Sequence, residues 1–199
     1  MDDPLAHITR LGNRYLGLRH GESEANVAGI VLSDPAAGVP GYGLTARGRA
    51  QVQASVAASA GLDAATWIVC SDFRRARESA EEAAAVLGAG APELRPALRE
   101  RWFGAHEGQR NDRYEQVWAR DREDPDHTEQ GVESARAVAR RVATLIVALE
   151  RERQGATILL VSHGDALQLL QTALLRLSPG THRERPHWGP GEVRPLELT

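Results

Sequence analysis

The sequence predicts an α/β fold in which a mostly parallel central sheet carries helices on both faces, together with a small cap region. Short apolar runs alternate along the chain with longer segments of helical character, and a polar turn follows each apolar run. Such alternation is typical of parallel sheets, whose strands are buried on both sides and therefore read as continuous apolar runs. We interpret residues 15–18, 67–70 and 157–161 as these strands.

Four longer segments are expected to form helices: residues 45–60, 75–87, 131–154 and 165–177. Thr45 is a suitable N-cap for the first, and Gly88 is a suitable end for the second. The third has the clearest pattern, because apolar side chains fall on one face and arginines and glutamates on the other. The alternation of strand and helix is therefore supported along most of the chain.

We expect residues 1–199 to form one domain, because no repeat, linker or break in composition divides the chain. Residues 102–130 are polar and contain four aromatic residues. We interpret this stretch as a partly helical cap that covers a site and sets its specificity. A solvated surface loop is the alternative. Residues 192–198 alternate enough to predict a short edge strand.

Composition excludes several classes of function. Hydrophobic residues make up 42% of the 199 residues, enough for a core, so disorder is not expected. A net charge of −3 argues against a broad nucleic-acid surface. All 24 lysine-plus-arginine residues are arginines, so Schiff-base chemistry and a lysine-containing phosphate loop are excluded. The guanidinium groups remain as phosphate ligands.

The sequence also leads to an expectation about location. The N-terminal residues lack the pattern of a secretory signal, and no apolar stretch is long enough to span a bilayer. Cys70 is the single cysteine, so no internal disulfide can form, and we interpret it as a core thiol. We expect a cytoplasmic protein with no membrane or nucleic-acid partner.

Polar residues with phosphate chemistry follow each of the three strands. The segments are residues 18–23 with Asn26, residues 71–76, and residues 161–165. Because the carboxyl ends of parallel strands meet at one edge of a sheet, we expect two histidines and at least two arginines to converge there. A neutral imidazole is a nucleophile at neutral pH, and arginines stabilise the charge of a phosphoryl group in flight. Each motif alone also occurs by chance.

Together these segments resemble the motifs of the histidine phosphatase superfamily, which includes the cofactor-dependent phosphoglycerate mutases. The matching segments are, in order, residues 18–23 with Asn26, 43–51, 71–80, 98–108 and 161–164. The resemblance runs from about residue 15 to about residue 170. It implies a phosphoglycerate mutase-like fold and a phosphohistidine intermediate.

The resemblance also implies a role for each matching residue. His20 is expected to accept the phosphoryl group, and Glu100 to protonate the leaving oxygen and then activate water. The other expected site residues bind phosphate or support the pocket: Arg19, Arg75, His163, Ser23, Asn26 and Gly164. A proton donor is chemically sensible because an alkoxide is a poor leaving group, and a nearby phosphate dianion helps a carboxyl group to keep its proton.

Two positions depart from the family pattern. Ala25 stands where many mutases carry an aromatic residue, and Asp165 follows the second His-Gly pair, where a small or amide residue is common. A carboxylate beside a phosphate is electrostatically unfavourable unless it points away or caps the helix, and we predict that Asp165 is a cap.

Several other histidines and arginines have no evident partner in the sequence. We expect His106 to be structural or solvated. We expect the others without a partner to be exposed: His7, His127, His182 and His187. Three arginines are interpreted as cap residues that contact an anionic substrate or lie in solvent: Arg101, Arg110 and Arg113.

These observations favour a phosphatase that hydrolyses a phosphomonoester of a small metabolite and needs no metal or other cofactor. Mutases of the family are usually longer and use a lysine over the substrate, and this chain has none. The alternatives are mutase-type phosphoryl transfer, a non-catalytic phosphoester-binding protein, and a zinc hydrolase built on His20 and His163. Zinc is disfavoured because no ligand cluster has the usual spacing. A monomer and a homodimer both remain open.

Overall fold

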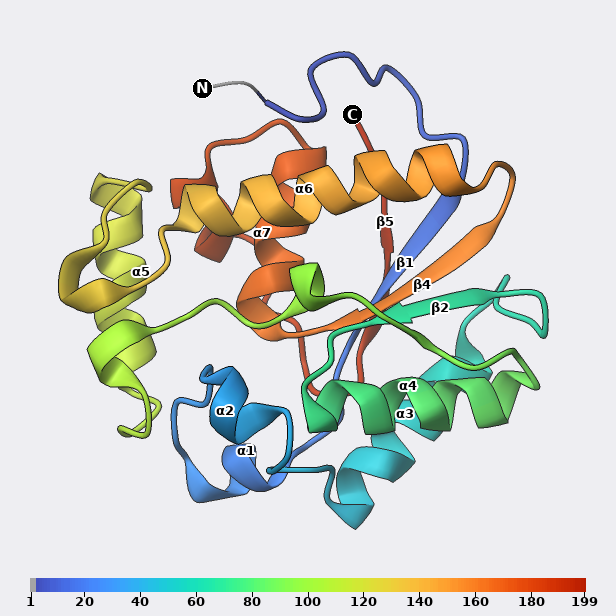
Figure 1. Cartoon of the computed structure of the whole chain (residues 1–199), viewed down its shortest axis with the longest axis horizontal. Coiled ribbons are helices and arrows are strands. Elements are labelled where there is room, and N and C mark those ends of the chain that lie inside the picture. Colours follow the sequence, from blue (N-terminus) through green and yellow to red (C-terminus); the bar gives the residue numbers. More distant parts are fainter. Residues whose placement is uncertain (1–2) are drawn as a thin grey trace.

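The computed structural model describes residues 3–199, and its centre is a five-stranded sheet of order β3-β2-β4-β1-β5 (Figure 1). All neighbouring strands in it are parallel except β5, which runs antiparallel to β1. The strands are β1 (Arg14–Arg19), β2 (Trp67–Cys70), β3 (Glu93–Leu94), β4 (Thr157–Ser162) and β5 (Val193–Leu196). The predicted α/β class with a mostly parallel sheet is confirmed.

Helices cover both faces of the sheet, with α6 and α7 on one side and α3 and α4 on the other (Figure 1). The helices are α1 (Glu24–Ala28), α2 (Pro35–Gly38), α3 (Ala46–Ala58), α4 (Arg74–Leu87), α5 (Arg113–Glu123), α6 (Ala135–Glu152) and α7 (Gly164–Leu174). The 3₁₀ turns are η1 (Pro96–Leu98), η2 (Gly104–His106), η3 (Glu129–Gly131) and η4 (Pro179–Glu184). Within residues 3–199, no helix is both long and apolar enough to cross a membrane.

Alternate residues of the strands contribute to two separate cores. Tyr15 and Ile158 pack with α6 and α7, whereas their neighbours Leu16 and Leu159 pack with α3 and α4. Side chains of a strand point alternately to the two faces of a sheet, so a strand covered on both sides must be apolar at consecutive positions. This explains the short apolar runs from which the strands were predicted. Cys70 is fully buried in the second core, as predicted for a core thiol.

Local caps set the helix boundaries. Thr45 Oγ1 accepts a hydrogen bond from Gly48 N at 3.0 Å, and Gly88 ends α4 at a φ of 66°, as predicted. Helix α6 begins at Ala135, four residues later than predicted, because Ser134 Oγ accepts a hydrogen bond from Ala137 N at 3.2 Å. Three elements were not predicted, namely α1, α2 and β3, because each is too short to show a periodic pattern.

Residues 102–130 leave the sheet and form η2 and α5, with α5 beside the start of α6 (Figure 1). Val117 of α5 is buried with Val31, Phe103 and Val132 in a small apolar cluster. Helix α5 also packs on η4 near the C-terminus. The segment is therefore tied down by its own apolar contacts. The last strand, β5, is the predicted short edge strand.

The loop after β1 is packed directly on the first turn of α3 through two glycines. A Cβ atom on Gly21 would lie 2.2 Å from the carbonyl oxygen of Gly48. A Cβ atom on Gly48 would lie 2.0 Å from the carbonyl oxygen of Glu22. Both distances are far inside van der Waals contact, and in each case the obstacle is backbone. The His20 loop can take its position only because both residues are glycine.

We therefore expect Gly48→Ala to lower the free energy of unfolding by about 3 kcal/mol, because backbone in this region has to move to admit the methyl group. Urea denaturation measures this change. Gly90→Ala is the matched control, because a Cβ atom there meets nothing within 4 Å. A Gly48→Ala protein as stable as wild type would contradict the close approach.

Candidate active site

A pocket of about 390 Å³ lies at the carboxyl ends of β1 and β4. Seven of the eight residues expected at the site line it: Arg19, His20, Ser23, Asn26, Arg75, Glu100 and Gly164. The eighth, His163, does not line this cavity. Its ring is fully buried and packs edge-on against that of His20, with the two centroids 5.2 Å apart. The three strand ends therefore converge, with one histidine at the cavity and the other packed against it.

His20 is almost completely buried, and its contacts assign its protons. Nδ1 lies 2.8 Å from the carbonyl oxygen of Gly21, so this nitrogen carries the hydrogen and donates it. Nε2 is therefore unprotonated, and its lone pair accepts a hydrogen bond from Arg75 Nε at 3.1 Å. Burial lowers the pKa of His20 well below its ordinary range, and the charges of Arg75 and Arg19 lower it further. Nε2 is thus an unprotonated nucleophile at neutral pH.

Two arginines lie near His20, and each has a buried N–H group without a hydrogen-bond partner. Arg75 comes from the first turn of α4 and is buried; Nη2 donates to the Leu32 carbonyl oxygen at 3.0 Å, while Nη1 has no partner. Arg19 Nη1 donates to the Trp188 carbonyl oxygen at 2.5 Å, while its Nε has no partner. Burial lowers the pKa of Arg75 to about 10, so the group stays charged at neutral pH. Unsatisfied buried donors on two cations form a cradle suited to an anion.

His163 is fully buried at the start of α7. Its Nε2 lies 2.9 Å from Ser71 Oγ, and its ring packs edge-on against Phe73 at 5.2 Å between centroids. Burial lowers the pKa of His163 well below the ordinary range, and the charge of Arg75 lowers it further, so the ring is neutral. Ser71 and Phe73 were not singled out in the sequence, although both lie in the segment after β2. They fix the orientation of the second imidazole.

Glu100 lies at another wall of the pocket, immediately before the buried Arg101. Its Oε1 accepts hydrogen bonds from the backbone N–H of Arg101 at 3.0 Å and of Ala166 at 3.3 Å. Burial raises the pKa of Glu100, and the charge of Asp165 raises it further. A carboxyl group with a raised pKa keeps its proton to higher pH, which suits a general acid.

The remaining expected residues shape the backbone of the pocket. Ser23 and Asn26 form a reciprocal cap at the start of α1: Ser23 N donates to Asn26 Oδ1 at 3.0 Å, and Asn26 N donates to Ser23 Oγ at 3.4 Å. Gly164 leaves room for Arg19, whose Cζ and Nε would lie 3.7 Å from a Cβ atom there.

Sequence reasoning missed four side chains that line the pocket from distant segments. Tyr114 and Trp118 of α5 stack with their ring centroids 5.4 Å apart, and Arg183 lies over Trp118 with Cζ 3.6 Å from the ring centroid. His187 lies between two arginines, with Nε2 3.0 Å from Arg19 Nη1 and Nδ1 2.9 Å from Arg183 Nη1. The spacing of Tyr114 and Trp118 is a helical i, i+4 signal that could have been used.

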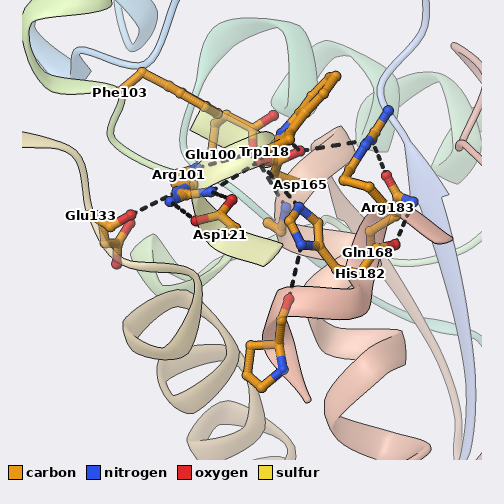
Figure 2. A network of polar contacts seen from close by, with 12 residues as sticks. Glu100, Arg101, Phe103, Trp118, Asp121, Glu133, Asp165, Gln168, His182 and Arg183 are labelled. Atoms are coloured by element: carbon orange, nitrogen blue, oxygen red, sulfur yellow. Dashed lines mark hydrogen bonds and ion pairs between the residues drawn. The ribbon is translucent and has the colours of Figure 1, made fainter. Parts of the chain in front are cut away.

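Four expectations about single residues were wrong. Arg101 lies neither in solvent nor at the substrate, because both its terminal nitrogens bind the buried Asp121 at 2.5 and 2.8 Å. His127 and His182 are buried, not exposed, and His127 Nε2 lies 2.9 Å from the same aspartate. Asp165 does not cap α7 but accepts hydrogen bonds from Trp118 Nε1 at 2.9 and 3.1 Å (Figure 2).

The remaining histidines behave more nearly as expected. His7 is exposed. His187 is also exposed, but it has the two arginine partners described above. His106 is buried and does not line the pocket, so the structural interpretation is the better one. Among residues 3–199, no three histidine, cysteine or acidic side chains are grouped so that they could hold a metal ion.

Comparison with known proteins extends this picture. Residues 16–199 match the model of the histidine phosphatase superfamily, branch 1. No curated protein gives a significant match by sequence. Three similar solved structures follow. A mycobacterial protein described as hydrolase 1 is 28% identical, with a TM-score of 0.73 over 90% of this chain and 86% of its own.

The second is a mycobacterial glucosyl-3-phosphoglycerate phosphatase in complex with inorganic phosphate, which is 27% identical, with a TM-score of 0.69 over 90% of this chain and 87% of its own. The third is the α-ribazole phosphatase of Shigella flexneri, which is 26% identical, with a TM-score of 0.70 over 90% of this chain and 88% of its own. The family model covers nearly the whole chain and includes both His20 and His163. The chain therefore belongs to the histidine phosphatase superfamily.

Proposed function

We propose that this protein is a phosphatase that hydrolyses a phosphomonoester of a small metabolite through a phosphohistidine formed on His20. The observation that carries the proposal is the neutral Nε2 of His20, which faces a pocket beside two guanidinium groups with unsatisfied donors. A nucleophile without a proton and a cradle for three anionic oxygens are the two requirements of phosphoryl transfer to an imidazole. Membership of the superfamily and its phosphatase neighbours support the same reaction.

In the first step we propose that the Nε2 lone pair attacks phosphorus while the bond from phosphorus to the ester oxygen breaks. The electron pair of that bond stays on the leaving oxygen, which takes the proton of Glu100. Arg19 and Arg75 hold the equatorial oxygens, and each has a buried N–H group without a partner in the structure. His163 packs edge-on against the ring of His20 and supports it. The products are an alcohol and a phosphohistidine.

In the second step the ionised Glu100 takes a proton from a water molecule, whose oxygen attacks phosphorus. The bond between Nε2 and phosphorus breaks, its electron pair returns to the ring, and inorganic phosphate leaves. His20 is again neutral and Glu100 again protonated, so the cycle closes without a metal or other cofactor. Hydrolysis is favoured over mutase-type transfer because the chain has no lysine to hold a second end of the substrate.

A screen of phosphorylated small metabolites tests this proposal, with release of inorganic phosphate as the readout. We expect turnover by wild type that survives a chelator and needs no bisphosphorylated primer. Turnover that depends on the primer would indicate a mutase, loss with chelator would indicate a metal hydrolase, and binding without turnover would indicate a phosphoester-binding protein. Any of these three results would overturn the proposal.

The pH dependence gives a separate test. Because only neutral His20 has a lone pair, activity falls when His20 takes a proton, and its lowered pKa moves that fall to lower pH. We expect kcat/KM for nitrophenyl phosphate, corrected for the ionisation of the substrate, to stay level from pH 7 to well below 6.5, the ordinary value for histidine. An acid limb at pH 6.5 or above would contradict the environment assigned to His20.

A further inference from the structure

Asp165 is a buried carboxylate that the reaction described above does not use. It is 3% exposed, lies in the first turn of α7, and lines the same pocket as Glu100. Figure 2 shows Glu100 and Asp165 beside each other within one network of polar contacts. An acidic group buried next to a phosphate site is electrostatically unfavourable for substrate binding, so its presence calls for a function.

The hydrogen-bond partner of Asp165 is electrically neutral. Both its oxygens accept from Trp118 Nε1 of α5, at 3.1 and 2.9 Å. The nearest cationic atoms are Nη1 of Arg101, 3.7 Å away, and Nη1 of Arg183, 3.9 Å away. Both distances exceed the length of a hydrogen bond. The carboxylate therefore lies within ion-pair distance of two guanidinium groups but is hydrogen-bonded to neither.

The groups that could neutralise Asp165 are engaged elsewhere. Both terminal nitrogens of Arg101 donate hydrogen bonds to Asp121, which is fully buried. His182 Nδ1 lies 2.9 Å from the carbonyl oxygen of Pro179, so the hydrogen of this neutral ring is on Nδ1. Its Nε2, 3.9 Å from Asp165, thus presents a lone pair and no proton. Neither of these two groups therefore hydrogen-bonds to Asp165 or gives it a proton.

The first turn of α7 connects this charge to Glu100. Ala166 N, in the residue next to Asp165, donates to Glu100 Oε1 at 3.3 Å, so one turn holds both carboxyl groups. The charged or titratable groups that act on Glu100 come from β1, α4, α5 and α7: Arg19, Arg75, Tyr114 and Asp165. Arg141 of α6 reaches only the backbone oxygen of Glu100, at 3.2 Å. Asp165 is the one carboxylate in this set.

We propose that Asp165 is a positioning residue for Glu100: its buried charge favours the protonated form of the general acid, and its hydrogen bond from Trp118 ties α5 to the turn that holds Glu100. This inference rests on the proposed function, because it assigns a role relative to the proton transfer of Glu100. After burial, Asp165 is the largest cause of the raised pKa of Glu100. Two carboxyl groups that share a dry site do not both ionise readily. Asp165 therefore favours the state of Glu100 that the first step requires.

Asp165→Asn tests this role because it keeps the shape and an acceptor for Trp118 but removes the charge. Glu100 must be protonated to help an alkoxide leave, so activity falls as pH rises through its pKa. This loss of activity is the alkaline limb of the pH profile. Without the charge of Asp165 the pKa of Glu100 is lower, so the limb moves to lower pH. We expect kcat/KM for an alkyl phosphate such as glycerol phosphate to fall about tenfold on the alkaline side of neutrality. Nitrophenyl phosphate, whose leaving group needs no proton, should change about twofold or less.

Asp112→Asn is the matched control, since it removes one negative charge from the exposed rim of the same pocket and should leave the limb in place. If Asp165→Asn does not fold, Asp165→Ala takes its place in the test, because it also removes the charge. An unmoved limb, or equal losses on both substrates, would overturn this inference while the phosphatase proposal stands. Absence of turnover in wild type would overturn the phosphatase proposal, and this inference with it.

Discussion

His20→Ala is expected to lose turnover of every phosphomonoester, by at least about 10³-fold in kcat. The reason is that Nε2 of His20 is an unprotonated ring nitrogen that lies beside Arg75, its hydrogen-bond donor, at the pocket. His163 cannot replace it, because that ring is fully buried, does not line the pocket and contacts Ser71 through Nε2. The loss should be the same for good and poor leaving groups, since the nucleophile is needed for both. Initial rates of phosphate release measure it.

The control for this variant is His7→Ala, which removes an exposed imidazole outside the pocket. Both variants should keep the thermal unfolding midpoint close to that of wild type, so that loss of activity is not loss of fold. A His20→Ala protein that keeps more than a tenth of wild-type activity would contradict the assignment of the nucleophile.

Glu100→Gln is expected to separate substrates by leaving group. Glutamine keeps an oxygen to accept from Arg101 N and Ala166 N, but it cannot give up a proton. We expect kcat/KM for an alkyl phosphate to fall about 10²- to 10⁴-fold, the usual contribution of general acid catalysis. For nitrophenyl phosphate, whose leaving group is already a weak base, we expect a loss below about tenfold. The ratio of the two losses measures the acid role.

The leaving-group comparison also has an internal control. Glu107→Gln changes a nearby glutamate that accepts hydrogen bonds from Ser33 and does not line the pocket, so both substrates should respond alike. Equal losses on both substrates in Glu100→Gln would contradict the acid role and would leave Glu100 with a structural one.

The strands and the main helices could be predicted because their burial produces a local pattern. Residues such as Tyr15 and Leu16 face opposite cores, so the strand they belong to is apolar at consecutive positions. Helix α6 could be predicted from its apolar stripe, but its start could not, because the hydroxyl of Ser134 decides it. Strand β3 has only two residues and is defined by its pairing with β2. A pairing between separate segments leaves no local pattern in the sequence, so β3 could not be predicted.

The centre of the site could be predicted for a similar reason. His20 and Arg19 follow one strand and His163 follows another, so a parallel sheet brings them to one edge. The rest depends on contacts between distant segments. Asp165 was expected to cap its own helix, but its partner is Trp118, 47 positions earlier. His187 reaches the pocket because η4 and the chain after it return to β1, which the sequence of that segment does not reveal.

The central claim is that a covalent phosphohistidine forms on His20. Stopping the reaction with base during turnover of a ³²P-labelled substrate, followed by peptide mapping, tests it most directly. We predict an acid-labile label on the peptide that carries His20, attached to Nε2 because Nδ1 is held by the Gly21 carbonyl oxygen. The label should be absent from His20→Ala. With labelled nitrophenyl phosphate, whose leaving group needs no proton, it should accumulate in Glu100→Gln, where water is not activated. Steady turnover with no label on His20, or a label on another residue, would contradict the account.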